Sequence, residues 1–171
     1  MNSTPPQSSA SLPETDSASA TTDPARTALL DALNELLEAE RAGARVAMET
    51  GRSITDPELA ALVDDIHKDE VRWCSMLMRT IKCLGAAPSS ATGSFHGKAM
   101  AIADLDERLK FLNRGQAWVT RKLQALIPQV DDARARSDLT DMLQAHHQNI
   151  SRVEARYTAP ATVEPTMAPQ T

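Results

Sequence analysis

The stretch LLDALNELLEAERAGARVAMETG, residues 29–51, decides the fold of this chain. Apolar and small residues recur in it every three or four positions, which is the spacing of one face of an α-helix. Asp23 and Pro24 precede it and form a helix start signal, an N-cap followed by the proline favoured at the first helical position. We therefore predict a long amphipathic helix that ends near Gly51. Its apolar stripe contains one charged residue, Glu40, among Leu29, Leu33, Leu36, Gly43 and Ala47.

Three further segments carry the same kind of stripe with one polar residue near the middle. The second segment opens on another Asp–Pro signal at residues 56–57 and runs to Gly85. The third is closed by Pro128, and the fourth is opened by Asp131 or Asp132. Each predicted helix has about 28 residues and is therefore about 42 Å long. The central polar residues of these three segments are, in order, Glu70, Gln116 and His146.

The composition of the chain favours helices over strands. It has 171 residues, of which 42% are hydrophobic and only 3% aromatic, and Leu and Ala dominate the apolar set. One hydrophobic core is expected from this length. The net charge of −5 does not favour binding to nucleic acid or to a membrane surface. No apolar run approaches the roughly 18 residues that a membrane span requires.

The cysteines and the first residues predict a cytoplasmic protein. Cys74 and Cys83 lie nine residues apart on one predicted helix, too far apart to form a disulfide with each other. We therefore expect reduced thiols, as in the cytoplasm. The first 25 residues contain no Lys or Arg and no apolar segment, so no secretory signal is expected.

We expect one domain, an antiparallel four-helix bundle of residues 23–157, between two tails. Residues 1–22 and 158–171 are built mainly from Ser, Thr, Pro, Ala and Gln, and we predict that both are disordered. Short turns after the first and third helices predict two antiparallel hairpins. Residues 86–101 connect the hairpins, and about 16 extended residues reach far enough to travel the length of the bundle. The pattern therefore favours a long crossover over an up-down-up-down arrangement.

The four central polar residues share one spacing. Glu40 and Glu70 are 30 residues apart, as are Gln116 and His146, and the second pair follows the first by 76 residues. The bundle should therefore hold them in one buried polar layer, and an unpaired buried polar group costs roughly 1–3 kcal/mol. Two solutions remain open. A transition-metal ion (iron, manganese or zinc) could bind the two carboxylates and the imidazole, or mutual hydrogen bonds could satisfy the layer.

Other polar residues flank this layer and are weaker candidates. His67 and Cys74 lie on one side of Glu70, and Asn149 lies beside His146. Each could add a ligand, although a buried cysteine is more often a small core residue. The tryptophans at positions 73 and 118 could line a small-molecule pocket, although large side chains in bundles usually fill space.

Three stretches resemble an uncharacterised bacterial branch of the ferritin-like superfamily, a domain of unknown function. The resemblance covers roughly residues 27–155 and excludes both tails. It implies a ferritin-like bundle of two hairpins joined by the long crossover. The resembling stretches are LLEAERAGARVA around Glu40, DEVRWCSML around Glu70, and GKAMAIADLDERLKFLNRGQAWV, which spans the third helix.

Ferritin-like carboxylate proteins place one Glu on each of two helices and a Glu-x-x-His pair on each of the others. Glu40 matches the first single Glu, and Glu70 matches the Glu of the first pair. The chain departs from this pattern with Trp73 in place of the first histidine, Gln116 in place of the other single Glu, and His146-x-x-Asn149 in place of the second pair.

These departures argue against a full di-iron centre. If metal binds, the resemblance implies one ion held by Glu40, Glu70 and His146, with Gln116 or Asn149 as further ligands. A redox-active ion would make an oxygen- or peroxide-handling oxidoreductase the natural enzyme class. The alternative is a non-catalytic structural or interaction bundle that forms a homodimer through its long helices. The resemblance implies no particular reaction.

Overall fold

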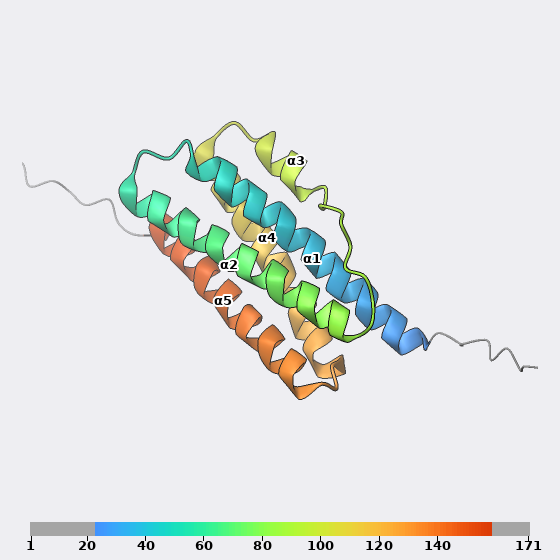
Figure 1. The fold of residues 1–171 in the computed structure, drawn as a ribbon. Coiled ribbons are helices and arrows are strands. Elements are labelled where there is room, and N and C mark those ends of the chain that lie inside the picture. Colours follow the sequence, from blue (N-terminus) through green and yellow to red (C-terminus); the bar gives the residue numbers. More distant parts are fainter. Residues whose placement is uncertain (1–22, 159–171) are drawn as a thin grey trace, which may run out of the picture.

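The computed structural model of the protein describes residues 23–158. The predicted tails lie outside this range, except for Thr158, which the sequence assigned to the second tail and which ends a helix. The described residues form helices and no strands, in the order α1 (Pro24–Gly51), α2 (Pro57–Cys83), α3 (Phe95–Met100), α4 (Leu105–Leu126), the 3-10 turn η1 (Ile127–Gln129) and α5 (Ala133–Thr158) (Figure 1).

The predicted start signals are N-caps in the structure. The side chain of Asp23 accepts a hydrogen bond from the backbone N–H of Ala25, and Asp56 accepts one from Glu58, both at 3.0 Å. Of the two candidates for the last helix, Asp132 fills the role and accepts from Ala135 at 2.7 Å. Each contact satisfies a backbone donor that a helix leaves free at its start.

Helix α4 is shorter than predicted. It has 22 residues, and its N-cap is Asp104, whose side chain accepts from the backbone N–H of Glu107 at 2.9 Å. The crossover, predicted to end at residue 101, therefore extends to Asp104. This capping aspartate makes the helix begin later than the apolar spacing indicated.

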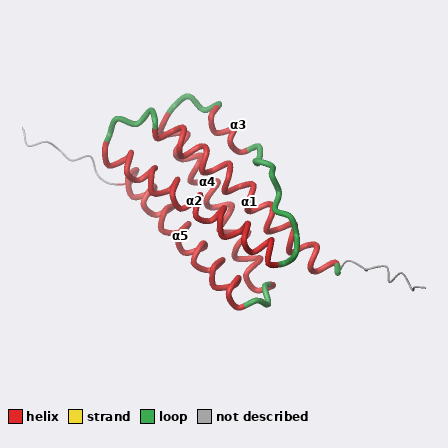
Figure 2. The backbone as a smooth tube through the Cα atoms, in the orientation of Figure 1, coloured by secondary structure: helices red, strands yellow, loops and turns green. Residues whose placement is uncertain are grey.

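The four long helices form the predicted bundle of two hairpins, in which neighbouring helices are antiparallel (Figure 1). Ion pairs join the hairpins: Arg152 binds Asp65 at 2.8 Å between α5 and α2, and Lys122 binds Glu35 at 2.8 Å between α4 and α1. The crossover runs along the outside of α1 and brings the chain from the end of α2 to the start of α4 (Figure 2). This long return makes α1 and α4 antiparallel neighbours.

The crossover is not wholly extended, because it contains the short helix α3. It is also held along α1 by specific hydrogen bonds. The backbone N–H of Ser89 donates to the side chain of Asn34 at 2.7 Å, and Arg41 donates to the carbonyl of Ala91 at 3.0 Å. Nε2 of His96 on α3 lies 3.0 Å from the carboxylate of Glu49 on α1. The crossover is therefore part of the packed structure.

The core has two apolar clusters. One contains Leu36, Leu77 and Leu123 among its members, and the other contains Val63, Ile66 and Leu112. The predicted central residues belong to neither cluster.

Candidate metal centre

The middle of the bundle holds a layer of buried polar side chains, one from each long helix. Their exposed fractions are 0% for Glu40, 4% for Glu70, 3% for Gln116 and 2% for His146. Each lies on the apolar stripe of its helix, so burial of the stripe carries the polar group inside with it. The layer contains two acidic side chains from α1 and α2, an amide from α4 and an imidazole from α5.

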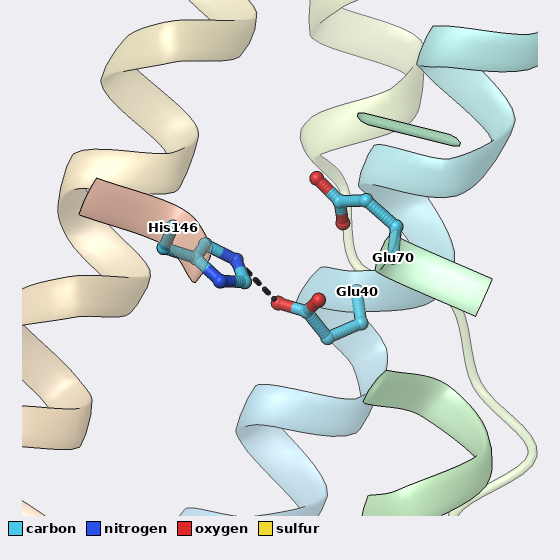
Figure 3. A group of neighbouring side chains, drawn as sticks. All are labelled: Glu40, Glu70 and His146. Atoms are coloured by element: carbon cyan, nitrogen blue, oxygen red, sulfur yellow. Dashed lines mark ion pairs between the residues drawn. The ribbon is translucent and has the colours of Figure 1, made fainter. Parts of the chain in front are cut away.

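Three of these side chains come together at one point. Donor atoms of Glu40, Glu70 and His146 all lie within 4.8 Å of one another. Figure 3 shows the three side chains reaching into the same space from three different helices. Helices that are far apart in sequence thus supply a compact set of oxygen and nitrogen donors.

A backbone contact fixes the orientation of the His146 ring. Its Nδ1 lies 3.0 Å from the carbonyl oxygen of Met142, one turn earlier on α5. A carbonyl only accepts, so Nδ1 carries a proton. The other nitrogen, Nε2, faces the Oε1 atom of Glu40 at 3.3 Å (Figure 3). In the neutral ring Nε2 then has the free lone pair that a metal ligand needs.

The electrostatics of the layer reflect its burial. Burial, followed by the charge of Glu40, raises the pKa of Glu70 well above its ordinary value. Burial alone would lower the pKa of His146, but the nearby charge of Glu40 and the contact of Nδ1 with the Met142 carbonyl outweigh it and raise this pKa. Without a cation, the layer therefore favours a protonated Glu70 and an imidazolium paired with Glu40.

Several buried polar atoms in the layer lack hydrogen bonds. Within residues 23–158, neither carboxylate oxygen of Glu40 has a partner of good geometry, and neither polar atom of the Gln116 amide has one. The ion pair with His146 is the nearest contact of Glu40. Orphaned buried groups of this kind are costly. A set of two carboxylates and one imidazole nitrogen is also a suitable donor set for iron, manganese or zinc. The residues present therefore fit a bound metal ion.

Gly43 makes room for one of the carboxylates. A Cβ atom at this position would lie 2.3 Å from Oε2 of Glu70, which is far inside van der Waals contact. The close approach of α1 and α2 at Gly43 thus lets the Glu70 side chain lie against the backbone of α1. The sequence showed this glycine on the apolar stripe but not its role, because the role depends on which helix lies opposite.

The flanking candidates are not brought into this group. Nδ1 of His67 lies 3.0 Å from the carbonyl of Ala44, and the Asn149 amide donates to Asp69 at 3.0 Å. Cys74 is buried but is not one of the three converging donors. Burial, with the charges of both central glutamates, raises the pKa of its thiol to about 12, so the thiol is protonated at neutral pH in metal-free protein.

A cavity reaches this layer. Its volume is about 530 Å³, and it lies between α1, α4 and the crossover. Gly43, Glu70 and Gln116 line it together with Trp118. Of the two tryptophans, Trp118 therefore does line a pocket, whereas Trp73 is buried in the apolar core.

The described helices have a ferritin-like fold with a layer of buried polar side chains at its centre. A crystal structure of ferritin-like, diiron-carboxylate proteins from Bacillus anthracis str. Ames is similar, with a TM-score of 0.69 and 16% identity over 78% of this chain and 98% of that one. A two-domain protein from Anabaena variabilis ATCC 29413, with DJ-1/ThiJ/PfpI-like and ferritin-like domains, has a TM-score of 0.62 and 15% identity over 85% of this chain and 42% of that one.

Residues 27–155 match the family described as a domain of unknown function, DUF6306, and the chain belongs to this family. No curated protein matches the chain. None of the helices between residues 23 and 158 is both long enough and apolar enough to cross a membrane.

Proposed function

We propose that the protein binds one transition-metal ion through Glu40, Glu70 and His146. The observation that carries this proposal is the convergence of three buried donors within 4.8 Å of one another. The unpartnered oxygens of Glu40 give a second reason, because a cation would compensate a carboxylate that the described residues leave without hydrogen bonds. The candidate ions are iron, manganese and zinc.

The chain's own residues would divide the work of holding the ion. Met142 fixes the His146 ring so that Nε2 faces the site, and Gly43 gives Glu70 its position. Gln116 is the remaining buried polar group of the layer, and its amide oxygen could complete the set. Bound iron or manganese would supply redox chemistry towards oxygen or peroxide, and the protein would then be an oxidoreductase.

Three converging donors support one ion better than two. The similar Bacillus structure is titled diiron-carboxylate, and such centres use four carboxylates and two histidines. Here Trp73 and Asn149 stand at two of the corresponding positions. Trp73 offers no ligand atom, and the amide of Asn149 is bonded to Asp69.

Metal content of protein purified without a histidine tag tests the proposal. We expect about one transition-metal ion per chain by elemental analysis and at least a tenfold loss of affinity for Mn²⁺ or Zn²⁺ in Glu40→Gln. Glu154→Gln on α5 is the matched control, because Glu154 is exposed and outside the layer. Metal-free, fully folded protein that binds neither ion at millimolar concentration would contradict the proposal.

A non-catalytic bundle is the second candidate function. It is favoured by the 3.3 Å contact between Nε2 of His146 and Glu40, which can satisfy both groups as an ion pair without metal. In this case the double variant Glu40→Leu/His146→Leu should leave the free energy of unfolding unchanged or raise it, because replacing a whole buried ion pair by apolar packing is often neutral or stabilising. Denaturant unfolding of this variant therefore separates the two candidates.

A further inference from the structure

The cavity beside the polar layer has an apolar body. Its volume of about 530 Å³ lies in the range of small-molecule sites in proteins. Its lining includes the apolar side chains of Ala39, Phe95, Phe111, Leu112 and Trp118. These residues come from α1, α3 and α4, so the crossover helix supplies part of the wall.

A glycine on α4 gives the aromatic part of this wall its shape. A Cβ atom at Gly115 would lie 2.6 Å from Cζ of Phe95, so only glycine lets the Phe95 ring lie against the α4 backbone. The same ring stacks on Phe111, with centroids 4.8 Å apart and an angle of 10° between the planes. The wall is thus a packed aromatic pair held in one orientation.

The outer part of the cavity carries cations without carboxylate partners. Lys98, Arg114 and Arg121 line it and are exposed, and none of them forms an ion pair within the described part of the chain. Two acidic residues also line this part of the cavity. Glu35 is paired with Lys122 at 2.8 Å, whereas Glu38 accepts a hydrogen bond from the hydroxyl of Ser89 and keeps its charge. Three unpaired cations therefore face one unpaired carboxylate, which leaves a local excess of positive charge in a chain of net charge −5.

The inner end of the cavity also presents an unsatisfied polar group. Gln116 is 3% exposed and lines the cavity, and its amide oxygen and nitrogen both lack partners among residues 23–158. A buried amide without hydrogen-bond partners needs an explanation, and a bound molecule or a bound metal ion would supply the missing contacts. The cavity therefore connects the cationic surface with the candidate metal centre.

We propose that this cavity binds a small apolar monocarboxylate, such as a medium-chain fatty acid. Its carboxylate lies among Lys98, Arg114 and Arg121, and its apolar chain lies between the aromatic pair and Trp118. Binding needs no metal ion. Any role of this molecule as a substrate at the centre rests on the proposed metal-binding function.

Calorimetric titration of metal-free protein with dodecanoate tests the site. We expect saturable binding of one molecule per chain, about tenfold weaker binding of dodecanol, and no saturable binding of dodecylammonium. Raised salt should weaken the binding of dodecanoate, because exposed charges are screened. Absence of saturable dodecanoate binding, or equal binding of the ammonium compound, would overturn the proposal.

Two sets of variants locate the site. The double variant Arg114→Glu/Arg121→Glu should bind dodecanoate about tenfold more weakly, because two exposed attractions become repulsions. Arg79→Glu, which changes an exposed cation on α2 outside the cavity, should bind as the parent does. Ala39→Trp should fill the cavity and abolish binding, whereas Ala61→Trp on the exposed face of α2 should not. Unchanged binding by both cavity variants would place the ligand elsewhere and overturn the assignment.

The same samples keep the two proposals separate. Protein that takes up one metal ion but does not bind dodecanoate contradicts only the cavity proposal. Protein that binds dodecanoate but takes up no metal contradicts only the metal proposal. Circular dichroism of each variant checks that loss of binding does not reflect loss of the fold.

Discussion

The hairpin of α1 and α2 and the hairpin of α4 and α5 have the same helical arrangement but contribute different side chains to the polar layer. The first contributes the carboxyl groups of Glu40 and Glu70, and the second contributes the amide of Gln116 and the imidazole of His146. The paired spacings of the polar residues make the two hairpins comparable position by position. The position of the polar layer thus follows from the repeated arrangement of the helices. The number of metal ions that the layer could bind depends on which residue types occupy it.

The hairpins also use glycine differently near the layer. Gly43 on α1 makes room for the carboxyl group of Glu70, whereas Gly115 on α4 makes room for the ring of Phe95. In the first hairpin the space admits the carboxyl group of Glu70 beside the backbone of α1. In the second hairpin the space at Gly115 lets Phe95 of the crossover pack against α4. The Gln116 amide next to it lines the cavity.

Making the hairpins more alike should give the largest effect. Gln116→Glu adds a third buried carboxyl group, and an uncompensated buried charge costs about 3 kcal/mol. We expect the free energy of unfolding of metal-free protein at pH 7 to fall by about this amount and to recover largely with excess Mn²⁺. Urea unfolding with and without Mn²⁺ measures both values, and the exposed Gln124→Glu is the control. Equal stability of variant and parent without metal would show that the layer is not closed to water.

Removing the space at Gly43 should have the next largest effect. Gly43→Ala keeps every donor but forces the Glu70 carboxyl group away from its position, because the new Cβ would otherwise lie 2.3 Å from Oε2. We expect affinity for Mn²⁺ to fall at least tenfold, measured by competition with a chelator. Gly51→Ala on the same helix meets only Val63 at an ordinary 3.7 Å and should keep the parental affinity. Unchanged affinity in Gly43→Ala would argue against Glu70 as a ligand.

The acidic hairpin should also give metal-free protein an unusual dependence on pH. Burial and the charge of Glu40 raise the pKa of Glu70 in the folded state above its ordinary value of 4.5, so the folded protein holds a proton that the unfolded chain releases. The free energy of unfolding should therefore fall as pH rises above about 4.5, by roughly 1 kcal/mol per pH unit.

Glu70→Gln should remove most of this fall, whereas Glu154→Gln should not. A smaller decline above pH 6.5 should remain, because the pKa of His146 is raised as well and this residue also releases its proton more readily in the unfolded chain. Urea unfolding between pH 5 and 8 measures both slopes. A stability that rises with pH throughout this range in metal-free protein would contradict the protonated state of Glu70.

The contacts that join the two hairpins at the surface should matter least. Arg152→Ala removes the 2.8 Å ion pair with Asp65, whose side chains are about half exposed. Exposed ion pairs contribute less than about 1 kcal/mol, so we expect only a small fall in the free energy of unfolding. Metal affinity should be unchanged. A larger loss would mean that this pair, rather than the buried stripe, holds α5 against α2.

The apolar stripes and capping signals of the sequence were sufficient to predict most of the fold. The long helices, the two hairpins and the crossover follow from residue spacing and from aspartates such as Asp23 and Asp56. The start of α4 was predicted too early, because its capping aspartate lies within a periodic stretch. Helix α3 was missed, because a helix of six residues leaves a weak signal in the sequence.

The candidate centre was predictable only as a list of polar residues. The structure brings together Glu40, Glu70 and His146, which the sequence named first, but directs Asn149 and His67 to other partners. Whether such residues bind a metal is a prediction that the experiments above must test. A helical stripe specifies the face of the helix on which a side chain lies. Hydrogen bonds to neighbouring helices then decide which partner that side chain contacts.

The sequence by itself determined that each of four amphipathic helices carries a polar residue near the middle of its apolar stripe, because helical periodicity is a local property of the chain. The tertiary structure alone decided that the imidazole faces a carboxylate, that Gly43 admits Glu70, and that a cavity joins Gln116 to a cationic rim. These features depend on contacts between helices far apart in sequence, and packing at the scale of single atoms sets them.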